Sequence, residues 1–435
     1  MKAIFSEETR LAHMLRVEAA LAAAQAGLGE IPAAAAKEIG RQASAKTVTV
    51  KRVADLERET GHDVMAVVLA LTERCNGDAG KYVHLGATSN DILDTATALQ
   101  LRDVFSILRA GLEGLTAALA ALAKKHRGTI MLGRTHGQAA VPITFGLKMA
   151  VFAAEVHRHR QRLDQAEPRV VVGKMSGAVG TGAAFGPKAR EIQRLVGESL
   201  GLPMEEASTQ VVSRDRHAEF TALLAAIASS CEKFATEVRN LQRTEIGEVA
   251  EAFDRKRQIG SSTMAHKENP ITSENVCGLA RVVRGFTIPA FEDVALWHER
   301  DLTNSSAERI LLPHACVLVD DILSKMTKVF SALRVYPTRM RENLDRTNGQ
   351  VMAEAVMIAL TGKGMGRQEA HKVVRDASLA AREKRVHLRE VLLKNSAVKS
   401  RLTVRELEQA LDPARYTGSS KAIVDDVLRG LVPMA

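Results

Sequence analysis

The chain has 435 residues, a formal net charge of +9 and 46% hydrophobic residues, of which few are aromatic (3% of the chain). This composition is globular and favours helices over strands, because aromatic and β-branched residues are the usual strand formers. The positive charge favours anionic small molecules over nucleic acid as ligands, since no basic block is interleaved with aromatic residues.

The cysteines and the N-terminal residues favour a reducing compartment inside the cell. None of the four cysteines belongs to a C-x-x-C pair, so the sequence predicts neither a zinc site nor a disulfide framework. The segment from Met1 to Arg10 contains acidic residues and lacks the apolar stretch of a signal peptide. No uninterrupted apolar run approaches the roughly 20 residues that span a bilayer. We therefore expect a cytoplasmic protein.

Helical spacing of apolar residues dominates the first half of the chain. We predict a first helix over Glu7 to Gly27, followed by a polar, alanine-rich stretch. A second helix is predicted around Val53 to Cys75. A longer one extends from Asp91 to the basic residues at 124–126, and another from near Pro142 to about Ala166.

The most regular helical pattern begins near Arg214. Seven apolar residues alternate steps of four and three and form a heptad seam: Phe220, Leu224, Ile227, Cys231, Phe234, Val238 and Leu241. A seam of this length requires neighbouring helices, either within this chain or in a bundle shared between subunits. The sequence leaves both arrangements open.

The predicted fold class is all-α, with a long central helix bundle. We expect an N-terminal helical domain at 1–93, the central bundle at 94–345 and a small helical domain at 346–435. Four short helical patterns fall in the last of these: 354–360, 367–381, 388–393 and 404–411. The Gly-rich connectors at 173–182 and 260–270 fit neither G-x-G-x-x-G nor a P-loop, which excludes a dinucleotide fold.

Polar residues gather at predicted helix ends and in loops, where functional groups usually lie, in four clusters: 82–94, 133–142, 208–219 and 260–274. In the first cluster, Ser89 and Asn90 fit N-capping and carboxylate binding equally well. In the second, His136 lies in a Gly-flanked polar loop and is either a structural histidine or a general acid.

The third and fourth clusters leave similar alternatives. Gln210 and His217 in the third are either caps or ligand contacts. The fourth combines serines, Lys267 and Asn269, and is either a solvated loop or a mobile loop that carries a nucleophile or base, a cation and an amide. A metal site is not predicted, because His157 and His159 face different directions on their helix. A Ser-His-Asp hydrolase is disfavoured because no G-x-S-x-G elbow is present.

Taken together, the clusters resemble the fumarase/aspartase superfamily, and most closely its adenylosuccinate lyase family. Residues 260–270 resemble the signature G-S-S-x-M-P-x-K-x-N-P. The sequences THGQ at 135–138 and TSND at 88–91 match the two other blocks. Further stretches at 61–63, 173–181, 209–219 and 296–309 resemble the adenylosuccinate lyase family specifically. The resemblance covers nearly the whole chain, in order.

The resemblance implies a carbon–nitrogen lyase that eliminates fumarate from adenylosuccinate, giving AMP, and from the succinylcarboxamide imidazole ribonucleotide of purine biosynthesis. It implies no cofactor and no metal, a small-molecule substrate, and neither a nucleic-acid nor a membrane partner. It also implies a homotetramer whose active sites are each shared by three subunits.

The family's functional residues transfer onto matching positions of this chain. By resemblance Ser261 is the base, His136 is the acid oriented by Glu274, and His62 assists near the leaving group. The fumarate carboxylates are expected to bind Thr88, Ser89, Gln210, Lys267 and Asn269, and the phosphate to bind Arg300, Ser305 and Arg309. The expected substrate-binding set is completed by His84, Asp91 and Thr135.

The sequence departs from the family pattern at three places. No Arg-Tyr pair precedes the first helix, Ala265 replaces a proline, and Glu268 stands where arginine is common. These departures favour an alternative, a superfamily lyase or cycloisomerase for an unphosphorylated succinyl-amine or related carboxylate. The first helix also resembles the carboxymuconate cycloisomerase branch, which typically lacks the histidine found here at His136. A catalytically dead scaffold is disfavoured, because the signature residues are retained together.

Overall fold

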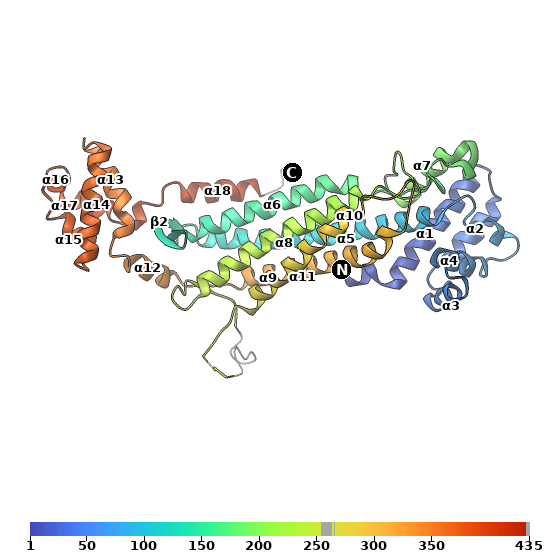
Figure 1. Cartoon of the computed structure of the whole chain (residues 1–435), viewed down its shortest axis with the longest axis horizontal. Helices are drawn as coiled ribbons and strands as arrows, with labels where there is room; N and C mark the ends of the chain where they lie inside the picture. Colours follow the sequence, from blue (N-terminus) through green and yellow to red (C-terminus); the bar gives the residue numbers. More distant parts are fainter. Residues whose placement is uncertain (254–262, 265, 432–435) are drawn as a thin grey trace. The chain divides into compact units, whose positions relative to one another are not determined.

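The computed structural model of the chain describes residues 1–253, 263, 264 and 266–431 (Figure 1). These residues are mostly helical, with two short antiparallel sheets, which confirms the all-α prediction. They form two compact units. The first comprises 1–112, 158–230 and 278–323, and the second comprises 113–157, 231–277 and 324–435. The predicted division into three domains stays a prediction.

Five helices contribute residues to both units: α5 (Ser89–Lys125), α6 (Phe145–Val170), α8 (Asp215–Gln242), α9 (Ile271–Gly285) and α11 (Thr303–Ser331). By length and composition alone, α5 could cross a membrane, with a mean hydropathy of 1.4 over one 18-residue window. The core helix of a soluble protein passes the same test, and α5 buries Leu99, Phe105 and Leu115 completely.

The first unit begins with α1 (Glu7–Gly27), whose bounds are those predicted. Ser6 caps this helix, because its hydroxyl accepts a hydrogen bond from the Thr9 backbone N–H. The alanine-rich stretch, for which no helix was expected, forms α2 (Ala33–Gln42) and buries Ile39 completely. In this unit α1 packs against both α2 and α7 (Ala189–Leu200).

The single helix predicted around Val53 to Cys75 is wrong, because the segment forms two helices, α3 (Val50–Thr60) and α4 (Asp63–Thr72). Gly61 ends α3 in the left-handed conformation, with φ of 67°, which glycine adopts without steric cost. His62 then caps α4, since its Nδ1 accepts from the Met65 backbone N–H at 3.3 Å. The break exposes the His62 side chain at a helix N-terminus.

In the second unit, the segment predicted as a loop around His136 is a β-hairpin instead. Strand β1 (Ile130–Thr135) pairs antiparallel with β2 (Gln138–Thr144), and α6 therefore starts at Phe145 rather than near Pro142. His136 and Gly137 form the two-residue turn with φ of 55° and 73°, as the tightest hairpins require. A register shift lies between Leu132 and Arg134.

The heptad seam of α8 is buried as predicted. All seven of its residues are at most 4% exposed. In the first unit Phe220 stacks on Phe105 with ring centroids 5.0 Å apart, and in the second Phe234 stacks on Phe152 at 4.3 Å. Such offset aromatic contacts add to the free energy gained from burial.

The chain's last part consists of short helices: α12 (Pro337–Asp345), α13 (Ala353–Gly362), α14 (Arg367–Glu383), α15 (Leu388–Leu392), α16 (Ser396–Lys399), α17 (Val404–Ala410) and α18 (Ser420–Gly430). Of these, α13 to α17 form a cluster (Figure 1). Four of them confirm the predicted helical patterns. A single apolar core joins α13, α14, α15 and α17 through residues such as Leu360, Val374 and Leu407. The remaining α-helix is α10 (Thr287–Glu292), and the remaining strands are β3 (Val249–Ala250) and β4 (Arg334–Val335).

Candidate functional site

A pocket of about 870 Å³ lies in the first unit. It brings together six residues predicted from the sequence to act on the substrate: His62, Ser89, Gln210, Arg300, Ser305 and Arg309. They come from the start of α4, the start of α5, the segment before α8, the segment before α11 and the first turns of α11. Three helices begin at this pocket, and the positive dipole ends of their N-termini favour an anionic ligand.

Gln210 and Arg300 are bonded to each other in this pocket. The Arg300 guanidinium donates from Nη1 to Oε1 of Gln210 at 2.7 Å. The Gln210 side-chain amide donates to the backbone carbonyl of Ala178 at 2.9 Å. The Gln210 backbone N–H donates to the backbone carbonyl of Glu299 at 3.2 Å. The segment that carries Gln210 is therefore fixed against two other walls of the pocket.

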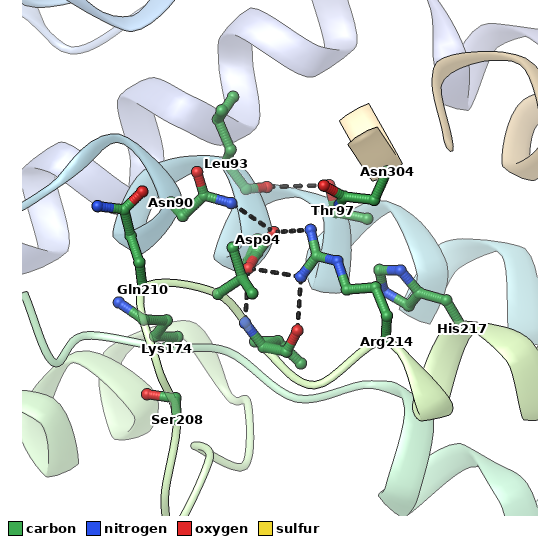
Figure 2. Close-up of polar contacts among 12 residues, drawn as sticks. Asn90, Leu93, Asp94, Thr97, Lys174, Ser208, Gln210, Arg214, His217 and Asn304 are labelled. Carbon is green, nitrogen blue, oxygen red and sulfur yellow. Dashed lines mark hydrogen bonds and ion pairs between the residues drawn. The ribbon is translucent and has the colours of Figure 1, made fainter. Parts of the chain in front are cut away.

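Asp94, on α5, anchors the same segment (Figure 2). Its carboxylate accepts from the Val212 backbone N–H at 2.8 Å and from both Nη atoms of Arg214 at 2.9 Å. Asp94 and Arg214 are about 5% exposed. Burial alone would raise the pKa of Asp94, but the charge and hydrogen bonds of Arg214 outweigh it and hold this pKa below its usual value.

Arg214 also links this segment to α11. Its Nε lies 3.0 Å from Oε1 of Glu308, which in turn lies 3.1 Å from Nδ1 of His217. Asn304 donates to the other oxygen of Glu308 at 3.1 Å. Nearby Asp293 is buried, and burial together with the Glu308 charge raises its pKa to about 6. Sequence reasoning missed this network, although His217 had been noted as a cap or a ligand contact.

Two residues predicted to bind substrate lie beneath the pocket wall instead of lining it. The Asp91 side chain is fully buried; its carboxylate accepts from Lys174 Nζ at 2.5 Å and from the backbone N–H groups of Ser176 and Gly177. It also accepts from the Thr88 backbone N–H at 2.9 Å. Asp91 thus ties the start of α5 to the Gly-rich connector at 173–182.

His84 is the second of these residues. Its Nδ1 lies 2.7 Å from Oε1 of Glu18, a carboxylate that is only 1% exposed. Burial lowers the pKa of His84, but the hydrogen bond and charge of Glu18 raise it by more. The pKa of His84 is therefore above its usual value. Gln25, also on α1, donates to the Leu85 carbonyl at 2.8 Å. Together these contacts hold the segment that leads to Thr88 and Ser89.

Thr88 lies in the first unit next to Ser89 but does not line the pocket, and the other predicted site residues that the structure describes belong to the second unit. Thr135 and His136 are exposed at the hairpin turn. Arg134, beside them, donates two hydrogen bonds at 2.9 and 2.7 Å to the fully buried carboxylate of Glu248, which Asn343 also contacts at 2.8 Å. This ion pair fixes the base of the turn and leaves its tip in solvent.

The signature loop is described in part. Ser261 and Ala265 lie outside the described residues. Lys267 and Glu274 are exposed and Asn269 is half-buried. In the described part of the chain, no hydrogen bond joins Glu274 to His136.

Glu268, one of the departures from the family pattern, lies in the same loop. Its carboxylate pairs with Arg334 at 2.5 Å within the second unit. Its negative charge is therefore balanced locally, which removes one of the grounds for doubting a phosphorylated substrate.

Comparison with known proteins defines the class. A family profile described as "Lyase" matches residues 1–285, and one described as "Adenylosuccinate lyase C-terminus" matches residues 349–427. Adenylosuccinate lyase from Methanothermobacter thermautotrophicus is 51% identical over 98% of this chain and 95% of its own length.

Solved structures agree with this class. The chain superimposes on a fumarate lyase from Mesorhizobium sp. BNC1 with a TM-score of 0.91, at 37% identity over 98% of this chain and 97% of that one. For the 3-carboxy-cis,cis-muconate lactonizing enzyme of Pseudomonas putida the TM-score is 0.90, at 36% identity over 99% and 96%. The fold is thus that of a lyase of the fumarase/aspartase type. Within that class, the chain belongs to the adenylosuccinate lyase family.

Proposed function

We propose that this chain eliminates fumarate from adenylosuccinate, giving AMP, and from the succinylcarboxamide imidazole ribonucleotide. The observation that carries the proposal is the pocket of the first unit, in which six residues expected from the family's motifs meet. Identity of 51% over nearly the whole chain to an adenylosuccinate lyase supports the same reaction.

The reaction requires a base, an acid and groups that stabilise negative charge. Ser261 as alkoxide removes the proton from the carbon next to a carboxylate, the electron pair forms the fumarate double bond, and the carbon–nitrogen bond breaks. His136 protonates the leaving nitrogen, and His62 assists there. Ser89, Thr88, Gln210, Lys267 and Asn269 bind the two carboxylates of the succinyl group, whose charge grows in the transition state.

The phosphate is assigned to Arg300, Ser305 and Arg309. Ser305 and Arg309 are four residues apart near the start of α11, so they share one face of the helix. The guanidinium fork is suited to bidentate binding of a phosphate. Asp91 and His84 are proposed to position the Thr88–Ser89 turn, because each is already bonded within the protein.

We further propose a cytoplasmic homotetramer whose active sites each combine residues of three subunits. Large apolar side chains of α10 and the segment after it are exposed in the single chain, among them Phe291 at 58% and Trp297 at 77%. Exposed apolar groups of this size mark surfaces that contact other protein. The expected role of Glu274 in orienting His136 would then be fulfilled between subunits.

Two variants test these roles. His136→Ala should lower fumarate release from adenylosuccinate by about a hundred-fold or more, the usual loss for a general acid. Ser261→Ala should do the same alone, yet a mixture of the two inactive proteins should recover activity after subunit exchange. Unchanged turnover in His136→Ala would exclude it as the acid, and a mixture without recovery would exclude shared sites.

A second candidate function is cleavage of an unphosphorylated succinyl-amine. The observation in its favour is that four carboxylates, Glu57, Asp63, Glu299 and Asp301, line the main pocket beside two arginines. Asp63 already pairs with two arginines, which offsets part of this negative charge.

A further inference from the structure

Two arginines from distant parts of the chain meet at one carboxylate of the first unit. Arg10 lies in the first turn of α1 and Arg309 in α11. Their Nη2 atoms are 3.2 and 3.4 Å from the same oxygen, Oδ2 of Asp63. The Arg10 and Arg309 side chains remain 44% and 63% exposed. One carboxylate charge is therefore shared between two guanidinium charges.

Arg10 faces the hollow that contains the proposed phosphate-binding residues. A second pocket of about 300 Å³ adjoins the main one and is lined by Arg10 together with Arg300, Ser305 and Arg309. The last three also line the main pocket. Three acids also line this second pocket: Glu7, Asp94 and Glu308. Asp94 and Glu308 are already bonded to Arg214, which leaves Glu7 as the remaining carboxylate beside the three arginines.

The hydrogen-bonding capacity of Arg10 is mostly unused. A guanidinium carries five N–H donors, and in the described part of the chain Arg10 makes one side-chain hydrogen bond, to Asp63. A simple link between helices would need one arginine, and an exposed ion pair of this kind contributes less than about 1 kcal/mol. A second, largely exposed guanidinium at the same carboxylate points instead to a ligand with more than one negative charge.

We propose that Arg10 binds the phosphate of the substrate as a third guanidinium beside Arg300 and Arg309, with Asp63 holding Arg10 and Arg309 in position. A phosphate monoester has a charge near −2 at neutral pH and three acceptor oxygens, which matches this arrangement. The inference rests on the proposed function, since it assigns a further residue to the phosphate of the same substrate.

The test compares substrates with and without the phosphate. In Arg10→Gln, the ratio of kcat/KM for adenylosuccinate to kcat/KM for its dephosphorylated nucleoside should fall about 10- to 100-fold, the range expected for one charged hydrogen-bonding group. The change should appear in KM. Arg10→Lys should recover part of the ratio, because it retains the charge but not the fork. Arg16→Gln, an exposed arginine on the same helix, is the matched control.

AMP binding, measured by calorimetry, separates this inference from the proposed reaction. Weaker AMP binding by Arg10→Gln than by Arg16→Gln, with adenosine binding equal, supports the inference even if no fumarate is released. AMP binding that Arg10→Gln leaves unchanged, or an equal loss for the phosphorylated and dephosphorylated ligands, would overturn it. A wild-type protein that binds AMP no better than adenosine would also overturn it.

Discussion

Replacing Asp94 by asparagine removes the negative charge that holds the Gln210 segment. The substitution keeps the side-chain shape and one acceptor oxygen for Val212, but it leaves the buried Arg214 with Glu308 as its remaining carboxylate. Removing one partner of a buried ion pair typically costs about 3–5 kcal/mol. Because Glu308 still pairs with Arg214, we expect a loss at the lower end of this range. The free energy of unfolding of the first unit should fall by about 3 kcal/mol.

Urea denaturation followed by circular dichroism measures this loss. Asp55→Asn is the matched control: Asp55 pairs with Arg58 at the surface of the same unit, where such a pair contributes less than about 1 kcal/mol. Asp94→Asn should also raise KM, because Gln210 loses its anchored position. If Asp94→Asn destabilised the protein no more than Asp55→Asn, the Asp94–Arg214 pair would not stabilise the segment.

The pH dependence gives an independent check on the same pair. The pKa of Asp94 is lower in the folded protein than in the unfolded chain, where it is about 3.9. The carboxylate therefore stabilises the fold above that value, and the contribution is lost as pH falls through the lower, folded pKa. The difference in stability between wild type and Asp94→Asn should accordingly be full at neutral pH and shrink below about pH 4.

Three further substitutions follow from the structure. Gly133→Ala would place its Cβ 2.4 Å from the Val141 carbonyl oxygen, so the hairpin must shift. Because the hairpin tip is then displaced, kcat for fumarate release should fall by about a hundred-fold. Gly180→Ala would place its Cβ 1.9 Å from the Ser208 carbonyl oxygen at a φ of +84°; the melting temperature should fall and KM should rise, because the neighbouring residues line the pocket. Burial raises the pKa of Asp293 to about 6, so ionisation of this carboxyl opposes folding as pH rises from about 4 to 6. Asp293→Asn should therefore stabilise the protein more at pH 7 than at pH 4, as measured by urea denaturation.

Local signals predicted the elements that depend on local chemistry. The bounds of α1 follow from the Ser6 cap and the apolar spacing after it, and the α8 seam is buried throughout. Local signals failed where one glycine or one turn decides the structure. Gly61 divides a helical pattern into two helices, and a two-residue turn at His136 makes a hairpin of an apparent loop.

Sequence motifs predicted the residues of the candidate site but not the residues to which they and their supports are hydrogen-bonded. Six residues chosen from separate motifs line one pocket. The pairs that support them, Asp91 with Lys174 and Asp94 with Arg214, join residues 83 and 120 positions apart. No spacing rule connects such residues, because their proximity arises from the packing of α5 against the connector at 173–182 and the segment before α8. For the same reason, Asp91 was assigned to the substrate when its carboxylate is fully engaged within the protein.

The most direct measurement is fumarate release, followed by ultraviolet absorbance, from adenylosuccinate, argininosuccinate and aspartate in parallel. We expect kcat/KM for adenylosuccinate to exceed the other two by at least about a hundred-fold, since neither competitor offers a phosphate to the arginines of the pocket. Equal rates for all three substrates, or release of fumarate from an unphosphorylated substrate alone, would contradict the assignment of this pocket to a succinylated nucleotide.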